Sequence, residues 1–264
     1  MVLFGKKFLV NDEILESEYF KKIYKFKVRN VYEVVRICDG SILFWNDHFN
    51  RLKNSILKLT GNNIDLNDIE FKIENVVNEN EISNGNIKIE ILFDDSDNFD
   101  LYIYPIKFYY PNENVGVDVI TYNIERNNPS IKTYDIFFKE TVGRVIEEND
   151  VYEILMLNKN GYITEGSRTN VYFVKDKCFF TASEDLVLSG VTRKRVNEII
   201  KELGFNLIEE SIHMENVFSF DCCFLTSTSS NVLPVKKING VDINSLNNVN
   251  MKKVQQLFRK YFQN

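Results

Sequence analysis

Residue types that mark cross-linked or metal-bound proteins are scarce in this sequence. Its 264 residues include four cysteines, at positions 38, 178, 222 and 223. Their spacing matches neither a zinc site nor a disulfide framework, so we expect four reduced thiols and no bound metal. The adjacent Cys222 and Cys223 are expected to point to opposite faces of one strand.

Long apolar runs and an excess of positive charge are also missing. Residues 1–30 are interrupted by lysines and glutamates, which argues against a signal peptide or a membrane helix in that stretch. The net charge is −6 and the pI is near 5.2, which gives no overall basic field for nucleic acid or an anionic membrane. We therefore expect a cytoplasmic protein whose partners are small molecules.

The sequence does contain enough apolar residues for a sizeable core. Hydrophobic residues make up 44% of its 264 residues, which favours one large or two modest domains. Residues 47–61 have apolar side chains at helical spacing, with Asp47 as a candidate N-cap and Gly61 as the stop. Just before this helix, residues 31–37 and 41–45 flank a short turn and predict a β-hairpin.

The same periodicities predict the remaining elements. Helices are expected at residues 69–77, 134–145, 192–204 and 254–261. Strands are expected at residues 87–93, 101–109, 115–122, 151–157 and 162–174. In the first of these strands, isoleucines alternate with Lys88 and Glu90, a pattern typical of a half-buried strand.

A break in this pattern predicts the domain boundary. Residues 125–130 lose all apolar periodicity and include Pro129, one of only four prolines. We therefore expect a smaller N-terminal α/β domain at residues 1–123, a linker at residues 124–131 and a larger C-terminal domain at residues 132–264.

The most unusual segment is TEGSRTN at residues 164–170. A carboxylate, a glycine and small polar side chains here interrupt a sequence that otherwise favours a strand. Such a break often serves a functional site. A β-bulge or hairpin corner with a solvated Glu165 explains the same residues equally well.

This segment resembles the signature of class IV aminotransferases, fold-type IV pyridoxal phosphate enzymes that include D-amino acid and branched-chain aminotransferases and aminodeoxychorismate lyase. Further segments are similar to other motifs of the family and occur in the required order. They are VYEVVR at 31–36, HFNRL at 48–52, GVTR at 190–193, and TSTSS at 226–230 with the residues that follow it. The similarity extends from about residue 31 to residue 239.

The resemblance implies a fold, a cofactor and an assembly. The fold would be α/β (α+β) with two domains, the larger C-terminal one containing a barrel-like sheet. The cofactor would be pyridoxal 5'-phosphate and the substrates an amino acid and a 2-oxo acid. The protein would be a homodimer.

The resemblance also assigns the catalytic lysine and the residues next to the cofactor ring. Lys132 occupies the position of the family's Schiff-base lysine, whereas the nearby Lys139 lies on a predicted helix. The lysine amine would condense with the cofactor aldehyde and later carry a proton between substrate and cofactor. Glu165 would keep the pyridine nitrogen protonated, and Ser167 of the same signature would also contact the cofactor.

Four residues are expected to bind the cofactor phosphate. Val191 and Thr192 begin a predicted helix, whose backbone N–H groups and dipole favour an anion. By resemblance, Arg51 and Thr228 complete this phosphate site. Without the resemblance, Arg51 is typical of an ordinary surface charge beside the apolar stripe of its helix.

The residues expected to face the substrate depart from the family pattern. Phe137 stands where transaminases of the family often have a tyrosine, and residues 25–30 replace a glycine-rich FGDG segment. D-amino acid transaminases bind the substrate carboxylate with an arginine at the end of a central strand. Phe93 and Asp94 stand there in this chain.

Two residues are candidates for substrate binding. Tyr32 would line the pocket, and Lys88 falls near an inward-facing arginine of branched-chain transaminases and the lyase. The alternation around Lys88 equally fits a solvent-facing lysine. We therefore expect a pyridoxal-phosphate-dependent aminotransferase, with a lyase of the aminodeoxychorismate type and a non-catalytic homologue as the alternatives.

Overall fold

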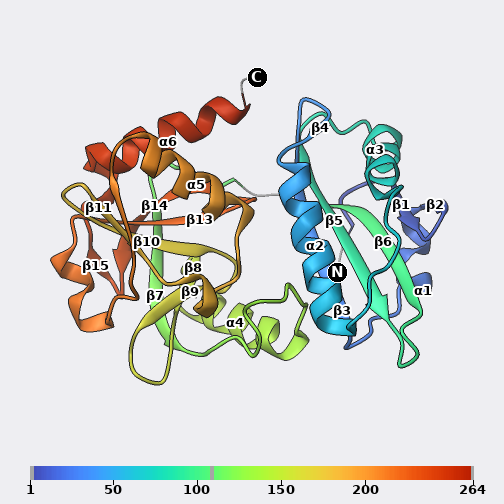
Figure 1. The fold of residues 1–264 in the computed structure, drawn as a ribbon, viewed down its shortest axis with the longest axis horizontal. Coiled ribbons are helices and arrows are strands. Elements are labelled where there is room, and N and C mark those ends of the chain that lie inside the picture. The colour runs from blue at the N-terminus through green and yellow to red at the C-terminus, as the bar shows by residue number, and fades with distance from the viewer. Residues whose placement is uncertain (1–2, 108–109, 263–264) are drawn as a thin grey trace. The chain divides into compact units, whose positions relative to one another are not determined.

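The computed structural model describes residues 3–107 and 110–262. The chain forms two compact units, each with its own sheet. Unit 1 comprises Met1–Tyr109 and Ile131–Asp135, and unit 2 comprises Tyr110–Ser130 and Ile136–Asn264 (Figure 1). None of the helices within the described ranges is long and apolar enough to cross a membrane.

Unit 1 is built on a six-stranded antiparallel sheet with the strand order β2-β1-β6-β5-β3-β4. The strands are β1 (Lys7–Val10), β2 (Glu13–Glu16), β3 (Asn30–Cys38), β4 (Ser41–Ile42), β5 (Gly85–Phe93) and β6 (Phe99–Ile106). The predicted hairpin is confirmed as β3 and β4, but its second strand ends at Ile42 instead of residue 45. The strand predicted at residues 101–109 is β6, although Phe108 and Tyr109 lie outside the described residues.

Two helices, α2 (Trp45–Thr60) and α3 (Ile69–Glu79), pack on one face of this sheet (Figure 1). Both were predicted from their apolar spacing. The N-cap prediction was wrong, because α2 begins before Asp47 and has Phe44 as its N-cap, with a φ of 55°. Gly61 ends the helix with a φ of 76°, a conformation that glycine adopts without strain.

The central strand β5 is buried on both faces, so the prediction of a half-buried strand was wrong. Its isoleucines pack against α2 and α3. The opposite face is covered by aromatic side chains around Phe20 in the short helix α1 (Phe20–Ile23) and Tyr104 in β6. Lys88 and Glu90 therefore lie within an aromatic cluster rather than in solvent.

Unit 2 contains a nine-stranded mixed sheet. Its strands run in the order β12-β11-β10-β13-β14-β7-β8-β9, and β15 pairs with β14. They are β7 (Val117–Asn123), β8 (Glu153–Leu157), β9 (Ile163–Gly166), β10 (Asn170–Lys175), β11 (Cys178–Thr181), β12 (Asn206–Glu209), β13 (Cys222–Ser227), β14 (Asn231–Ile238) and β15 (Val241–Asp242). The predicted strand at residues 162–174 is thus two strands, β9 and β10, separated by a corner.

Three helices complete unit 2: α4 (Ile136–Glu148), α5 (Val191–Glu202) and α6 (Val249–Arg259). Helix α4 packs on β8, whereas α5 and α6 contact each other as well as β13 and β14. The barrel-like sheet encloses an apolar core from β7 to β14. Short 3₁₀ turns occur at Ser17–Tyr19, Glu184–Leu186, Met214–Ser219, Ser245–Asn247 and Lys260–Phe262.

The division of the chain differs from the expected one on both sides of the linker. Strand β7 was assigned to the first domain, but it pairs with β8 and β14, which places it in unit 2. Residues 131–135 instead belong to unit 1. The helix predicted from residue 134 begins at Ile136 because Tyr134 is bonded to unit 1.

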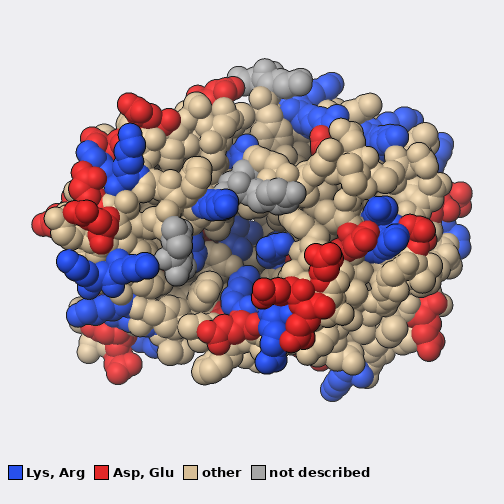
Figure 2. Space-filling model, turned by 180° about the vertical axis from the view of Figure 1, so that it is seen from behind, with Lys and Arg blue, Asp and Glu red and all other residues tan. Residues whose placement is uncertain are grey.

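Charged side chains of both signs are interspersed on the face shown in Figure 2. This distribution fits the modest net charge of −6. The four cysteines are free thiols, of which Cys222 and Cys223 are buried in β13. Burial raises the pKa of Cys222 to about 12, so this thiol stays protonated and unreactive at neutral pH.

Candidate active site

Lys132 lies in the segment Ile131–Asp135, which belongs to unit 1 and is hydrogen-bonded to β3. Its carbonyl oxygen accepts a hydrogen bond from the N–H of Tyr32 at 2.9 Å, and its own N–H donates to Ser55 Oγ at 3.4 Å. The amine Nζ lies 4.6 Å from the centre of the Tyr32 ring, close enough for a cation–π contact. The main chain and the amine of Lys132 are thus both placed by residues of unit 1.

Lys88 lies close to the same tyrosine. Its Nζ is 5.1 Å from the ring centre of Tyr32 and 4.7 Å from that of Tyr134, and it forms an ion pair with Glu90. The Lys88 side chain is only 7% exposed, which excludes the solvent-facing alternative. The structure therefore brings together Tyr32, Lys88 and Lys132, three residues predicted from sequence.

Glu90 compensates the charge of Lys88. Its carboxylate also accepts a hydrogen bond from the hydroxyl of Tyr104. Burial, and then the negative charge of Glu90, raise the pKa of Tyr104 and of Tyr24, so both phenols remain protonated. A ligand carboxylate that reached Lys88 would have to share it with Glu90.

Arg51 is held by a buried carboxylate in unit 1. Its Nε and one Nη donate to the two oxygens of Glu33 at 2.7 and 2.6 Å, which is a bidentate pair. His48 Nδ1 lies 3.0 Å from the same carboxylate. Since the side chain of Arg51 is only 12% exposed, it is not an ordinary surface charge.

The pKa values of Glu33 and His48 are shifted by their burial and by the charges beside them. Burial alone would raise the pKa of Glu33, but Arg51 and then His48 outweigh it and lower that pKa to about 2. Burial lowers the pKa of His48 more than Glu33 raises it. The imidazole is therefore neutral at pH 7, and Nδ1 carries the hydrogen because the carboxylate can only accept.

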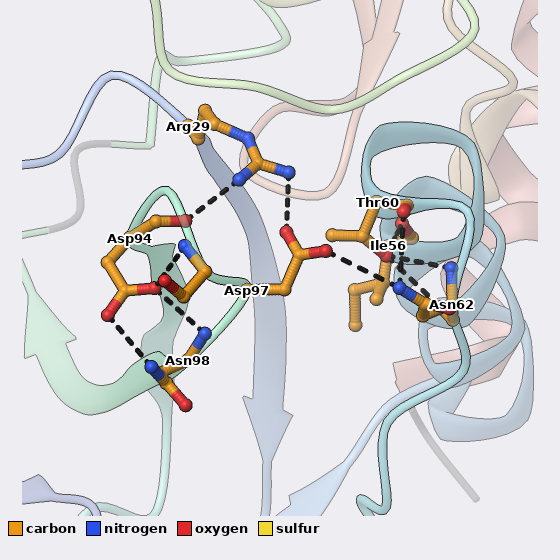
Figure 3. A network of polar contacts seen from close by, with 8 residues as sticks. Arg29, Ile56, Thr60, Asn62, Asp94, Asp97 and Asn98 are labelled. Atoms are coloured by element: carbon orange, nitrogen blue, oxygen red, sulfur yellow. Dashed lines mark hydrogen bonds and ion pairs between the residues drawn. The ribbon is translucent and has the colours of Figure 1, made fainter.

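The segment at residues 25–30 is tied to the hairpin between β5 and β6, as Figure 3 shows. Arg29 donates to the main-chain oxygen of Asp94 at 2.8 Å and to the carboxylate of Asp97 at 2.6 Å. Asn62, just after α2, donates to the same carboxylate. Arg29 thus fixes one end of the sheet.

The departures from the family pattern have structural explanations. Phe93 is 2% exposed and belongs to the core of unit 1, and the Asp94 carboxylate accepts from the N–H groups of Ser96 and Asn98. Neither side chain provides a positive charge for a substrate. Phe137 is on α4 and is 78% exposed.

In unit 2, Glu165 lies in β9, next to the corner that leads to β10, and is 2% exposed. One carboxylate oxygen accepts from Arg126 Nε and the other from the N–H of Leu188, both at 3.0 Å. Arg126 also donates to the main-chain oxygen of Ser167 at 2.9 Å. The alternative of a solvated Glu165 is therefore wrong.

A second buried carboxylate, Glu153 on β8, holds the corner itself. One oxygen accepts from the hydroxyl and the N–H of Ser167 at 2.6 and 3.2 Å. The other accepts from the N–H of Arg168 at 3.2 Å and the hydroxyl of Thr169 at 3.3 Å. Glu153 is fully buried, and no motif in the sequence points to a role for it. Ser167 therefore points toward Glu153 in this structure.

The first turn of α5 begins at Val191 and Thr192, as predicted. Its N-cap is Gly190, where a Cβ would lie 2.1 Å from the side-chain oxygen of Asn170, so a larger residue does not fit. Asn170 in turn donates to the main-chain oxygen of Leu188 at 3.0 Å. The helix start and the Glu165 corner are thus connected.

This helix start fits an anionic group. Gly190 has no side chain with which to cap the first N–H groups of α5, which leaves them suited to a phosphate. Thr226 is on β13, which contacts α5, and its buried Oγ1 has no hydrogen-bond partner among the described residues. Thr228 lies in the turn that follows β13.

A cavity of about 130 Å³ opens beside Glu165 and Arg126 within unit 2. Its lining residues come from the 125–129 segment, from β8 and β9, and from the turn before α5. They are Glu125, Arg126, Pro129, Met156, Asn158, Thr164, Glu165, Asp185 and Leu186. The Glu165–Arg126 pair therefore borders a space that is accessible to small groups.

Comparison with known proteins agrees with the sequence motifs. The model of the family "Amino-transferase class IV" matches residues 30–238. The D-alanine aminotransferase of Bacillus licheniformis is 26% identical over 230 residues, which are 81% of this chain and 81% of that protein.

Two solved structures share the fold at low sequence identity. The branched-chain amino acid aminotransferase from Escherichia coli is 22% identical, with a TM-score of 0.81 over 98% of this chain and 94% of that one. A candidate 4-amino-4-deoxychorismate lyase from Legionella pneumophila is 18% identical, with a TM-score of 0.80 over 92% and 97%. The predicted fold class is confirmed.

The Glu33–Arg51 pair makes stability depend on pH. Because the pKa of Glu33 is lowered from 4.5 to about 2, its contribution is complete above pH 4.5 and is lost as the pH falls towards 2. We expect Glu33→Gln to lower the free energy of unfolding by about 3 kcal/mol at neutral pH and by progressively less across that window.

Urea unfolding at neutral pH and across the acid window measures this difference. Glu79→Gln is the control, because Glu79 forms a partly exposed ion pair with Lys7 in the same unit and should affect stability little. A loss of stability from Glu33→Gln that did not change with pH would contradict the assignment.

Glu153→Gln tests the support of the Glu165 corner. An amide would present N–H hydrogens to groups that are themselves donors, so we expect a loss of about 1–3 kcal/mol in the free energy of unfolding. The control is Glu198→Gln, which removes a partly exposed partner of Arg195 on α5. Urea unfolding of both variants measures the effect, and equal stability of Glu153→Gln and wild type would refute it.

Proposed function

Because this chain belongs to the class IV aminotransferase family, we propose that it is a pyridoxal-phosphate-dependent enzyme that transfers an amino group between an amino acid and a 2-oxo acid. Enzymes of this family depend on pyridoxal 5'-phosphate. The observation that carries the proposal is the setting of Lys132, whose main chain is bonded to unit 1 and whose amine lies over Tyr32. We propose that Lys132 binds the cofactor covalently.

The polar residues described above fit the parts of this cofactor. In unit 2, the N–H groups at Val191 and Thr192, together with Thr228, would hold its phosphate. For Arg51 of unit 1, the same role rests on the family resemblance alone. Glu165 would hold the proton on the pyridine nitrogen. Its buried carboxylate is already oriented by Arg126 and Leu188. When bound, the cofactor supplies an electron sink for the substrate carbanion.

Lys132 has a second proposed task, which is to move a proton. An amine released from its covalent bond can accept a proton from the substrate carbon and return it elsewhere. We also propose that the enzyme acts as a homodimer, as the family resemblance implies.

The substrate class follows from the residues around Tyr32. The arginine expected of a D-amino acid transaminase at Phe93 and Asp94 is replaced, and Lys88 is a buried basic residue near Tyr32. We propose that Lys88 binds a substrate carboxylate, sharing its charge with Glu90. A basic residue that faces inward on this strand also agrees with the lyase alternative, so elimination of pyruvate from aminodeoxychorismate is the second candidate reaction.

Borohydride reduction tests the role of Lys132. The purified protein, incubated with pyridoxal 5'-phosphate, is expected to show a yellow chromophore that borohydride abolishes, with the label mapped to Lys132 by mass spectrometry. We expect Lys132→Ala to lose the label and Lys139→Ala to keep it. Labelling at Lys139, or no chromophore after reconstitution, would refute the proposal.

A panel of amino donors tests the reaction and the role of Lys88. Individual L- and D-amino acids should convert the aldehyde form of the cofactor to the amine form, which is followed by absorbance. We expect Lys88→Met to raise the KM of the best donor about tenfold or more, the scale of one lost charged contact. Pyruvate release from aminodeoxychorismate without any donor response would favour the lyase, and no response to either would favour a non-catalytic homologue.

A further inference from the structure

Asn30, at the start of β3, binds the main chain of the segment that carries Lys132. Its side-chain oxygen accepts from the N–H of Tyr134 at 2.7 Å, and its amide group donates to the main-chain oxygen of Tyr134 at 3.0 Å. Asn30 is 1% exposed and is 104 residues away from Tyr134 in the sequence. We propose that Asn30 is a positioning residue for Lys132.

The amide of Asn30 is itself held in place. Its nitrogen also lies 3.1 Å from the main-chain oxygen of Lys27 and 3.0 Å from that of Val28. The side-chain nitrogen therefore connects the turn before β3 with Tyr134, and the side-chain oxygen also binds Tyr134. An asparagine is suited to this task because it offers one acceptor and two donors. A buried N–H or C=O that loses such a partner destabilises its segment.

Tyr134 follows Lys132 by two residues, so hydrogen bonds that hold the main chain of Tyr134 also restrict the position of Lys132. The carbonyl of Lys132 is bonded to Tyr32, and the N–H and carbonyl of Tyr134 are bonded to Asn30. These three contacts fix the direction of the segment along the edge of β3. The other main-chain contact of Lys132, to Ser55, is long at 3.4 Å. Asn30 thus contributes the short contacts on the C-terminal side of the lysine.

The same segment places the aromatic groups next to the amine. The Tyr134 ring lies 6.3 Å from the Tyr32 ring at 75°, and 4.7 Å from the amine of Lys88. Movement of the Tyr134 main chain would therefore alter the positions of Lys132 and of the ring beside Lys88 together. The segment at residues 25–30 replaces a glycine-rich sequence, and glycine has no side chain that could make these bonds.

A matched control exists in the same unit. Asn80 accepts from the N–H of Lys7 at 3.0 Å and donates to the main-chain oxygens of Lys7 and Val76 at 3.0 and 2.8 Å. It connects main-chain segments in the same manner as Asn30, but at the end of α3. Asn80→Ala therefore removes a comparable set of bonds without touching the Lys132 segment.

The first measurement is hydrogen exchange in the full-length protein without added cofactor. We expect the amide of Tyr134 to be protected in the wild type and to exchange about tenfold faster or more in Asn30→Ala, the scale of a lost buried hydrogen bond. In Asn80→Ala it should exchange at the wild-type rate. An unprotected Tyr134 amide in the wild type would overturn the proposal even if Asn30→Ala did not fold.

The second measurement concerns the amine itself, and here the inference rests on the proposed function of Lys132. Borohydride trapping of pyridoxal 5'-phosphate on Lys132 should be about tenfold slower in Asn30→Ala, and kcat should fall while KM changes little. Asn80→Ala should match the wild type in all three quantities. Faster exchange without any change in trapping or kcat would reduce Asn30 to a structural residue and overturn the proposal.

The two proposals fail in different ways. If the wild type traps no cofactor on Lys132, the proposed function is refuted, whatever the exchange rates are. If the wild type traps the cofactor on Lys132 and Asn30→Ala does so equally fast, only the positioning role is refuted.

Discussion

The burial of carboxylates on β-strands is the constraint on which the candidate site depends. Glu33, Glu90, Glu153 and Glu165 are each at most 2% exposed. An ionised carboxylate inside a protein is strongly unfavourable unless it is paired or hydrogen-bonded, so each one fixes the groups around it. Arg51, Lys88 and Arg126 are held where they are because they neutralise three of these charges.

The buried carboxylate of Glu153 is stabilised mainly by hydrogen bonds instead of a close ion pair. It accepts hydrogen bonds from main-chain N–H groups and from the hydroxyls of Ser167 and Thr169. Arg168 approaches it only to 3.7 Å and is half exposed. The corner that follows Glu165 therefore has a defined conformation, because N–H and hydroxyl groups in it donate to the carboxylate of Glu153.

The sequence was sufficient for the family and for several of the elements, because both depend on local pattern. Apolar spacing predicted α2, α3 and α5. The motifs also predicted the start of α5, and they singled out Lys132 and Glu165, whose roles stay predictions. The spacing did not reveal that β5 is covered on both faces, because the aromatic residues that cover Lys88 come from distant segments of the chain.

The roles of Glu33, Glu153 and Asn30 were missed for related reasons. Glu33 lies between Val31 and Val35 at strand spacing, so it shares a buried face with them, a signal that could have been recognised. Glu153 begins an entirely apolar run, which is a similar signal. Asn30 gave no such signal, because its partner Tyr134 lies more than a hundred residues away. Contacts of this kind cannot be predicted from one sequence without the fold.

The assignment of Ile131–Asp135 to unit 1 has a consequence for how the chain can be divided. Between Tyr109 and Ile136 the chain leaves unit 1, returns to it and leaves again, so the units are joined by three passages instead of one. A fragment that ended at residue 109 would contain the whole six-stranded sheet. It would lack the segment that satisfies the N–H of Tyr32 and the amide of Asn30. The lysine segment is thus an integral part of a unit from which it is separated in sequence, and no single cut yields both units intact.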